Sequence, residues 1–584
     1  MKQFVPFSLL MGGTLVITVS LSAFSANAQS LSGVLAGSTS TINNAPSDEY
    51  LTNIALGFHA LTSNTAGGYN IAIGKQSLKF NTTGSHNSAV GYNSLYSNTT
   101  GDYNSAFGSN SLNNNTMGSF NSAFGYYSLL YNTTGYRNSA FGYQSLHSNT
   151  TGDNNSAFGF ISLLRNTTGF SNSAFGYYSL LDNTTGNYNS AFGANSLRFN
   201  TTGYRNSAVG VFSLYSNTTG NGNSAVGFYS LYSNTTGSNN SAVGSDSLVS
   251  NTTGENNSAF GVDSLYSNTI GNWNSAVGMQ SLRFNTTGNQ NSAFGALSLG
   301  LNTTGNFNSA FGYLSLYYNT TGIGNTANGH QALYKNTSGS LNLAEGYQAL
   351  FNSRGKWNVG LGYRGGYNIT TGLNNIAISN LGNAADTGVI RIGTTGTHTA
   401  TLIAGINGAT ATGGVAVYID ANGQLGTVTS SRRFKNEIKS MGNVSDKLLQ
   451  LRPVTLRYKS ADSKGGHPLQ YGLIAEEVAK VFPDLVQYDK QGKPFTIYYH
   501  LLTPMILNQL QREHGSHKAE VNVLKNEVAT LRASYNTKVS SLEAQLASMR
   551  QAQAEQQKLL VKLAAYVQST KPNAPIQKVN IVQH

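Results

Sequence analysis

A repeating pattern of small, apolar and polar positions covers more than half of the chain. A glycine recurs every 17 residues from Gly57 to Gly346, which makes 18 positions. Each unit reads N-S-A-[FV]-G-x-x-S-L-x-x-N-T-T-G-x-x, as in the copy that begins at Asn121. Helical arrays repeat at ~33 residues or more, so this shorter period indicates a stack of another kind.

The pattern within one unit predicts a β-solenoid. Small or apolar residues alternate with polar ones, so we expect Ala123 and Leu129 to face inward from a short strand-like path. The Asn-Thr-Thr-Gly segment predicts a turn in which Gly135 adopts a positive φ. Stacking identical units places Asn over Asn and Thr over Thr, which predicts ladders of side-chain hydrogen bonds.

The interior of such a coil has few apolar residues to fill it. Each unit offers only Ala, Phe or Val, and Leu dependably, which is little for one chain to close around. Three chains that share one interior would each need only one wall, so we expect a mainly β, trimeric β-roll. A monomeric left-handed solenoid, with ~18 residues per turn, is the alternative.

The repeats resemble the heads of trimeric autotransporter adhesins, whose N-S-x-A-x-G units build a trimeric β-roll, although the period here is longer. This resemblance implies a surface fibre. Tyrosines after the motif glycine, such as Tyr126 and Tyr127, could stack on a cell-surface or glycan ligand, but packing between coils is the favoured interpretation. The Asn-Thr-Thr triplets match the N-glycosylation pattern, and their place at every turn favours a structural role.

The N-terminus predicts export. Lys2 is followed by an apolar stretch over 4–24 and by the small-x-small sequence Ala26-Asn27-Ala28, which a signal peptidase accepts. An uncleaved membrane anchor is the alternative, since ~20 apolar residues span a bilayer. We expect a secreted or bacterial cell-surface protein with no transmembrane anchor after processing.

Composition agrees with a fibre. Only 10% of the 584 residues are charged, against roughly 25% in ordinary domains, and there are 65 glycines. The chain has no cysteine, so it lacks a disulfide framework and thiolate chemistry, and we expect no metal site and no cofactor.

The sequence changes character at T-S-S-R-R-F-K-N-E-I, which begins at Thr429. A predicted strand at 453–458 and the segment Y-G-L-I-A-E-E-V at 471–478, which opens an amphipathic helix, follow it. This combination resembles the endosialidase-type intramolecular chaperone domain of phage tailspikes and tail fibres, over about residues 430–514.

The resemblance implies a self-cleaving peptidase. In that family the pattern is Ser-Asp-x-Arg-x-Lys, with the Ser as nucleophile, the Lys as its partner and cleavage just before the Ser. The matching positions here are Ser430 and Lys435, which implies one cut between Thr429 and Ser430 and no action on other substrates. Ser431 stands where the family has Asp, so the Asp's contribution is in doubt.

A Ser-Lys pair can act only if its lysine is neutral. A serine hydroxyl becomes a good nucleophile when a base takes its proton. Lysine is a base only when neutral, so its pKa must fall from ~10.4 through burial or a neighbouring cation. Arg432 and Arg433 could supply that cation, and a trimer interface could supply the burial.

The segment around Ser430 also allows a structural interpretation. Ser430 or Ser431 could cap a helix that has Glu437 in its early turns. His467 and His500 are nearby titratable residues, and we assign neither a role.

A heptad pattern predicts a coiled coil near the C-terminus. The apolar positions, with a four-residue stutter in the middle, are Leu524, Val528, Leu531, Tyr535, Val539, Leu542, Leu546 and Met549. A membrane-surface helix is the alternative, although the stripe is narrow. 

Charge is concentrated in the C-terminal part of the chain. From Ser430 onward there are 22 Lys/Arg and 12 Asp/Glu, against 13 and 11 before it. A basic surplus can indicate nucleic acid, but no nucleic-acid motif accompanies it and export conflicts with a DNA-binding role, so a solvated tail is preferred.

These observations predict an exported homotrimeric fibre whose C-terminal chaperone drives assembly and is then released by autoproteolysis. The alternative is a surface adhesin that retains the domain uncut as a trimerisation module. The expected segments are a signal peptide (1–28), a linker (29–50), solenoid repeats (51–365), a β-rich neck (366–429), the chaperone and peptidase domain (430–514), a coiled coil (515–565) and a tail (566–584).

Overall fold

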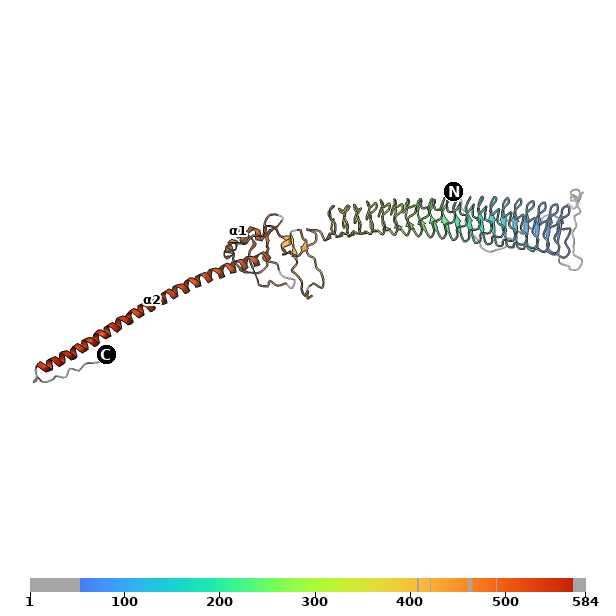
Figure 1. Cartoon of the computed structure of the whole chain (residues 1–584). Coiled ribbons are helices and arrows are strands. Elements are labelled where there is room, and N and C mark those ends of the chain that lie inside the picture. The colour runs from blue at the N-terminus through green and yellow to red at the C-terminus, as the bar shows by residue number, and fades with distance from the viewer. Residues whose placement is uncertain (1–52, 407–408, 421, 461–464, 490, 571–584) are drawn as a thin grey trace. The chain divides into compact units, whose positions relative to one another are not determined.

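The computed structural model describes residues 53–406, 409–420, 422–460, 465–489 and 491–570. The chain divides into two units, one up to Leu402 and one from Ile403 (Figure 1). Each unit is described by itself. The expected signal peptide, the linker and the last part of the tail lie outside the described residues.

The first unit is a parallel β-solenoid, which confirms the mainly β fold. Its 21 strands form one sheet, and Ser122 and Ala123 pair with Ser139 and Ala140 of the next coil, one period away. The strands are β1 Ile54–Leu56, β2 Ile71–Ile73, β3 Ser88–Val90, β4 Ser105–Phe107, β5 Ser122–Phe124, β6 Ser139–Phe141, β7 Ser156–Phe158, β8 Ser173–Phe175, β9 Ser190–Phe192, β10 Ser207–Val209, β11 Ser224–Val226, β12 Ser241–Val243, β13 Ser258–Phe260, β14 Ser275–Val277, β15 Ser292–Phe294, β16 Ser309–Phe311, β17 Thr326–Asn328, β18 Leu343–Glu345, β19 Val359–Leu361, β20 Ile376–Ile378 and β21 Ile390–Ile392.

The interior closes within one chain. Ala123 and Leu129 face inward as predicted and are 0% exposed. The expectation that three chains must share the interior overlooked the polar side chains, because Asn121, Ser128 and Asn132 are equally buried and fill the rest of the coil. Three solenoids therefore do not need to share an interior.

Two ladders of buried asparagines connect the coils. Asn132 Nδ2 donates to Asn115 Oδ1 at 2.8 Å and to the Gly135 carbonyl at 2.9 Å. In the second ladder, the Asn138 backbone N–H donates to Asn121 Oδ1 at 3.0 Å. The predicted Asn ladders are thus confirmed, and the burial of Asn132 within the Asn-Thr-Thr triplet supports its structural role.

The threonine ladder differs in detail from the expected stacking of hydroxyls. Thr133 Oγ1 donates to the backbone carbonyl of Thr150 in the next coil at 3.0 Å. The hydroxyl therefore adds a bond to the backbone of the next coil.

The two glycines of each unit have different roles. Gly125 has a φ of 138°, a conformation that favours glycine. The expectation of a positive φ at Gly135 is wrong. Glycine is needed there because a Cβ atom would lie 2.4 Å from Asn132 Oδ1 and 2.5 Å from the Gly152 carbonyl oxygen.

In most coils three non-glycine residues adopt the left-handed conformation, which the sequence pattern did not reveal. In one copy they are Tyr127, Leu129 and Arg137, with φ of 58°, 52° and 55°. This conformation costs roughly 1–2 kcal/mol per residue. Hydrogen bonds between coils offset the cost, since Leu129 N donates to Ser145 O at 3.0 Å and Tyr127 N to Ser109 O at 3.1 Å.

Aromatic side chains after the motif glycine stack along the solenoid. Ring centroids are 5.7 Å apart for Tyr126 and Tyr143, 5.1 Å for Tyr143 and Phe160, and 5.5 Å for Phe160 and Tyr177, with nearly parallel planes. Each ring covers the face of the next, so these faces are not free to stack on a sugar. The arrangement supports the packing interpretation.

The parallel sheet continues beyond residue 365 into the segment expected to be a neck. The spacing becomes irregular there, because β19, β20 and β21 begin at Val359, Ile376 and Ile390. A hairpin of β22 (Tyr418–Ile419) and β23 (Leu425–Gly426) follows in the second unit.

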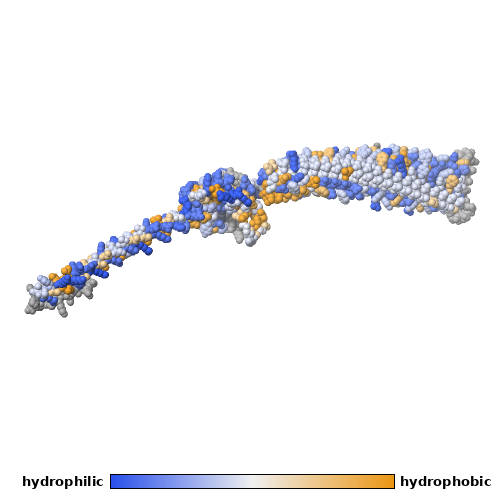
Figure 2. Space-filling model, in the orientation of Figure 1, coloured by the Kyte–Doolittle hydropathy of each residue, from blue (hydrophilic) through white to orange (hydrophobic). Residues whose placement is uncertain are grey.

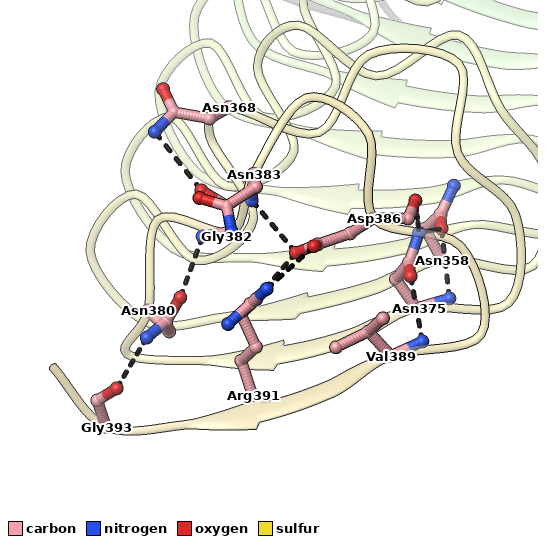
Figure 3. Close-up of polar contacts among 10 residues, drawn as sticks. All are labelled: Asn358, Asn368, Asn375, Asn380, Gly382, Asn383, Asp386, Val389, Arg391 and Gly393. Atoms are coloured by element: carbon pink, nitrogen blue, oxygen red, sulfur yellow. Dashed lines mark hydrogen bonds and ion pairs between the residues drawn. The ribbon is translucent and has the colours of Figure 1, made fainter. Parts of the chain in front are cut away.

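An ion pair closes this end of the solenoid (Figure 3). Arg391 of β21 pairs in register with Ala377, so it occupies the position of the inward alanine. Arg391 Nε lies 2.6 Å from Asp386 Oδ2, and Asp386 is only 7% exposed. The Arg391 hydrogen bond holds the pKa of the Asp386 carboxyl below its ordinary value. The charged pair ends the apolar column, as capping repeats do in solenoids.

The second unit contains the remaining elements. They are η1 Arg432–Phe434, η2 Val444–Gln450, β24 Val454–Leu456, β25 Gln470–Gly472, α1 Ala475–Val481, η3 Pro483–Leu485, β26 Val486–Tyr488, β27 Pro494–Ile497 and α2 Tyr499–Thr570. A small core contains Val478, Leu485, Ile497 and Leu502. Among the described residues, no helix has the length and apolar character required to cross a bilayer.

The period predicts how the solenoid tolerates deletions. Removal of residues 94–110, one full period, keeps every ladder in register and should lower the melting temperature only slightly. Removal of residues 94–102 should lower it far more, because each buried polar group that loses its partner costs about 1–3 kcal/mol. Thermal melting of both variants beside the parent is the measurement, and equal damage would contradict a 17-residue structural unit.

The terminal ion pair predicts a local, pH-dependent effect. Asp386→Asn should speed amide exchange in β20 and β21 at neutral pH by roughly fivefold, because a partly exposed ion pair contributes about 1 kcal/mol. The folded-state pKa of Asp386 is lowered. Its contribution is therefore complete above the unfolded value of ~3.9 and is lost as the pH falls through the folded value.

The control is Asp182→Asn, which breaks an ion pair with the largely exposed Arg165 within the array. It should leave exchange at β20 and β21 unchanged. Equal exchange in the parent and Asp386→Asn would rule out a capping role for Asp386.

Candidate functional site

The structure brings the two candidate catalytic side chains together. Lys435 Nζ lies 3.3 Å from Ser430 Oγ, within hydrogen-bond reach, and both residues are exposed in the single chain. Nucleophile and base must touch in this way for a proton to pass from the hydroxyl to the amine. Thr429, whose carbonyl carbon the hydroxyl would attack, directly precedes Ser430.

A single turn of 3-10 helix produces this contact. In η1, Phe434 N donates to Ser431 O at 3.0 Å and Lys435 N donates to Arg432 O at 3.1 Å. Because the turn has about three residues, it reverses the chain and returns Lys435 toward Ser430.

The helix-cap alternative is not supported. Ser431 precedes η1, but its side chain makes no capping hydrogen bond. Glu437 lies outside η1 with a φ of 52° instead of in early turns of a helix. The expected α-helix is reduced to three residues, so Ser430 is left without a structural role as a cap.

The residues just before Lys435 are charged or aromatic. Arg433 lies over the ring of Phe434, with its guanidinium carbon 4.7 Å from the ring centroid. Arg432 and Lys435 are exposed, so the single chain does not bury this cluster.

The second sequence motif, 471–478, has a structural role in this unit. Arg452 Nη2 lies 2.6 Å from Glu477 Oε1, and this pairing lowers the pKa of the Glu477 carboxyl. The neighbouring Val478 is 1% exposed and packs in the core. The motif thus attaches α1 to the rest of the unit.

A polar network that the sequence pattern did not indicate connects η2 to α2. Ser445 is 0% exposed, and its hydroxyl donates to Gln509 Oε1 at 3.0 Å. Asn508 Nδ2 donates to Ser445 Oγ at 2.6 Å, and Arg512 pairs with Asp446 at 3.1 Å. These partners lie more than 60 residues apart, so no local signal could have identified them.

The two nearby histidines have structural contacts. His467 Nδ1 is 2.9 Å from the Tyr458 carbonyl oxygen. The His500 ring lies 4.6 Å from that of Tyr418. Neither contact involves the Ser430–Lys435 pair.

Comparison with known proteins gives one match. Residues 430–487 match the model of a peptidase family described as chaperone of endosialidase. No curated protein and no solved structure matches the chain. The matched segment starts at Ser430, so the chain carries from this residue a domain of the chaperone-of-endosialidase family, which supports trimer assembly of the tail-fibre type and, in general, a self-cleaving peptidase.

Proposed function

We propose that the protein is an exported, trimeric fibre whose C-terminal domain assembles three chains and then cuts itself off between Thr429 and Ser430. The observation that carries this proposal is the 3.3 Å contact between Ser430 Oγ and Lys435 Nζ at the first residue of the family match. Export rests on the apolar N-terminal stretch and its Ala-Asn-Ala site.

The cleavage chemistry uses one serine and one lysine. Ser430 Oγ attacks the carbonyl carbon of Thr429 while neutral Lys435 takes the hydroxyl proton. The Thr429–Ser430 amide bond breaks, the Ser430 amine leaves with a proton, and an ester joins Thr429 to the Ser430 oxygen. Water then hydrolyses this ester to a Thr429 carboxylate and the free hydroxyl, so each chain is cut once.

An apolar stripe on the solenoid supports association between copies. The outward position of each strand is apolar at every seventeenth residue from Leu56 to Phe311, and Phe107, Phe192 and Val209 are 37%, 42% and 41% exposed. In Figure 2, apolar residues gather along the edges of the solenoid. The stripe residues together expose on the order of 1,000 Å² of apolar surface. This area is larger than the largest apolar patch on a typical monomer and comparable to one side of a stable interface.

Another copy of the solenoid presents a stripe with the same spacing. A partner must present apolar groups at the same spacing over many coils, which a second solenoid with the same period does. The stripe ends at Asn328, whose Nδ2 donates to Glu345 Oε1 at 2.8 Å. A shift by one coil would place this polar pair against an apolar position, so the pair favours the aligned register.

The long helix α2 supports the same association. Leu524, Val528, Leu542 and Leu546 are 57%, 48%, 55% and 46% exposed. Heptad stripes of this kind are normally buried against other helices. Three parallel copies would cover the stripe and hold three chaperone domains together.

The second candidate is a retained, uncut trimerisation module on a surface adhesin. One observation favours it, namely Ser431 at the position where the family has Asp. A denaturing gel of the purified protein separates the two, because processing produces a fragment that begins at Ser430.

Ser430→Ala and Lys435→Ala should each reduce cleavage by at least roughly a thousandfold while the chains still associate. Each change removes one half of an interdependent pair. Gel electrophoresis with N-terminal sequencing measures the cut. Ser431→Ala is the matched control and should still cleave. A fragment that begins at Ser430 in either of the first two variants would exclude the pair.

Cleavage should also depend on assembly, because the single chain leaves Lys435 exposed. Leu542→Glu with Leu546→Glu places charges in the helical stripe and should block both trimer formation and processing. The control, Ala544→Glu with Ser548→Glu, puts the same charges on the opposite side of α2 and should preserve both. Light scattering and gels report the two properties, and efficient processing by a monomer would refute the dependence.

A further inference from the structure

The heptad pattern of α2 extends toward its N-terminus through two histidines. Positions that step by three and four residues along the helix are Leu507, Leu510, His514, His517, Val521, Leu524, Val528, Leu531 and Tyr535. Only His514 and His517 in this series are ionisable at neutral pH. They occupy two consecutive positions of an otherwise apolar seam.

Within the described residues of the second unit, both positions are exposed. The neighbours Leu510 and Val521 are 61% and 47% exposed, and the His517 side chain is 78% exposed. If α2 forms the three-helix bundle of the proposed function, on which this inference rests, the same positions face the bundle axis. Three copies then place three His514 and three His517 rings in adjacent layers, about one helical turn apart.

Imidazoles buried in such layers need partners, because unpaired polar groups in a dry interior are costly. A divalent transition metal provides them, since neutral imidazole is a preferred ligand of Zn²⁺, and bundle cores are common places for metal sites. We propose that His514 and His517 of three chains form a site for a divalent transition metal on the axis of the helical bundle.

Symmetry explains why the site is not visible in one chain. Among the described residues, no three His, Cys, Asp or Glu side chains gather into a metal-binding group. The lack of cysteine excludes thiolate ligands, and from the sequence alone we therefore expect no metal site. A three-fold axis supplies three imidazoles from a single histidine position, so no cluster within one chain is required.

A carboxylate is placed to orient one of these ligands. Glu520 Oε2 lies 3.6 Å from His517 Nδ1, one turn further along the helix. A carboxylate beside one ring nitrogen favours a proton there and leaves Nε2 free for a metal, an arrangement common around zinc-bound histidines.

The neighbouring charges on α2 and η2 already have partners. Arg512 pairs with Asp446 of η2 at 3.1 Å, and Glu513 Oε1 accepts a hydrogen bond from Gln509 Nε2 at 3.1 Å. Lys518 follows His517 directly, outside the series of seam positions.

The test uses the purified full-length protein with Zn²⁺ as the probe. Light scattering first establishes the number of chains, and titration calorimetry with elemental analysis then gives the zinc content. We expect about one or two zinc ions per three chains. His514→Leu with His517→Leu should keep the trimer and reduce zinc affinity by at least a hundredfold. The control, His500→Gln, removes an imidazole from α2 outside the seam and should bind zinc like the parent.

The outcomes separate this inference from the proposed function. A parent protein that is not trimeric overturns the proposed function and the site with it. A trimer that binds no zinc at micromolar concentration, that binds one ion per chain, or that binds equally well in the double variant overturns the site alone.

Discussion

The hydrogen bonding between successive coils is the interaction on which the solenoid depends. Each coil contains only a small apolar interior, in which Ala123 and Leu129 are surrounded by buried Asn and Ser side chains. Those amides would be costly if unpaired, and they are paired only when the next coil lies in register. The ladder through Asn115 and Asn132, together with the backbone bonds of the left-handed residues, therefore makes the period itself the condition for folding.

The same regularity creates a problem for assembly. Identical coils can pair with one another in many registers at nearly equal free energy, whether within one chain or between copies. The deviations from the repeat are therefore informative. Asp386 and Arg391 end the stack, and Asn328 with Glu345 interrupts the outer apolar stripe. A chaperone domain with its own small core and a separate helix can set chain number and alignment without relying on the repeats.

How much the sequence could predict follows from the range of each interaction. The period predicted the inward alanine and leucine and the asparagine ladders, because these follow from stacking alone. It could not show that Leu129 is left-handed or that Gly135 is required by a close contact, since both depend on the neighbouring coil. In the second unit, the motif predicted the contact of Ser430 with Lys435, a local turn, whereas the buried Ser445 depends on α2 more than 60 residues away.

The location of the proposed cut would make assembly irreversible. A cut after Thr429 would separate the repeats from all elements that follow Ser430 in the chain, including η2, α1 and α2. Once these are gone, chains that come apart have no domain that restores their number and register. A cut fibre would then be maintained by the slow rate of its dissociation, which is kinetic stability. Lys435 is exposed in a single chain. If it becomes a base only when other copies bury it, cleavage would not occur until assembly is complete. The protonation state of one side chain would in this way make cleavage depend on the assembly of the whole fibre.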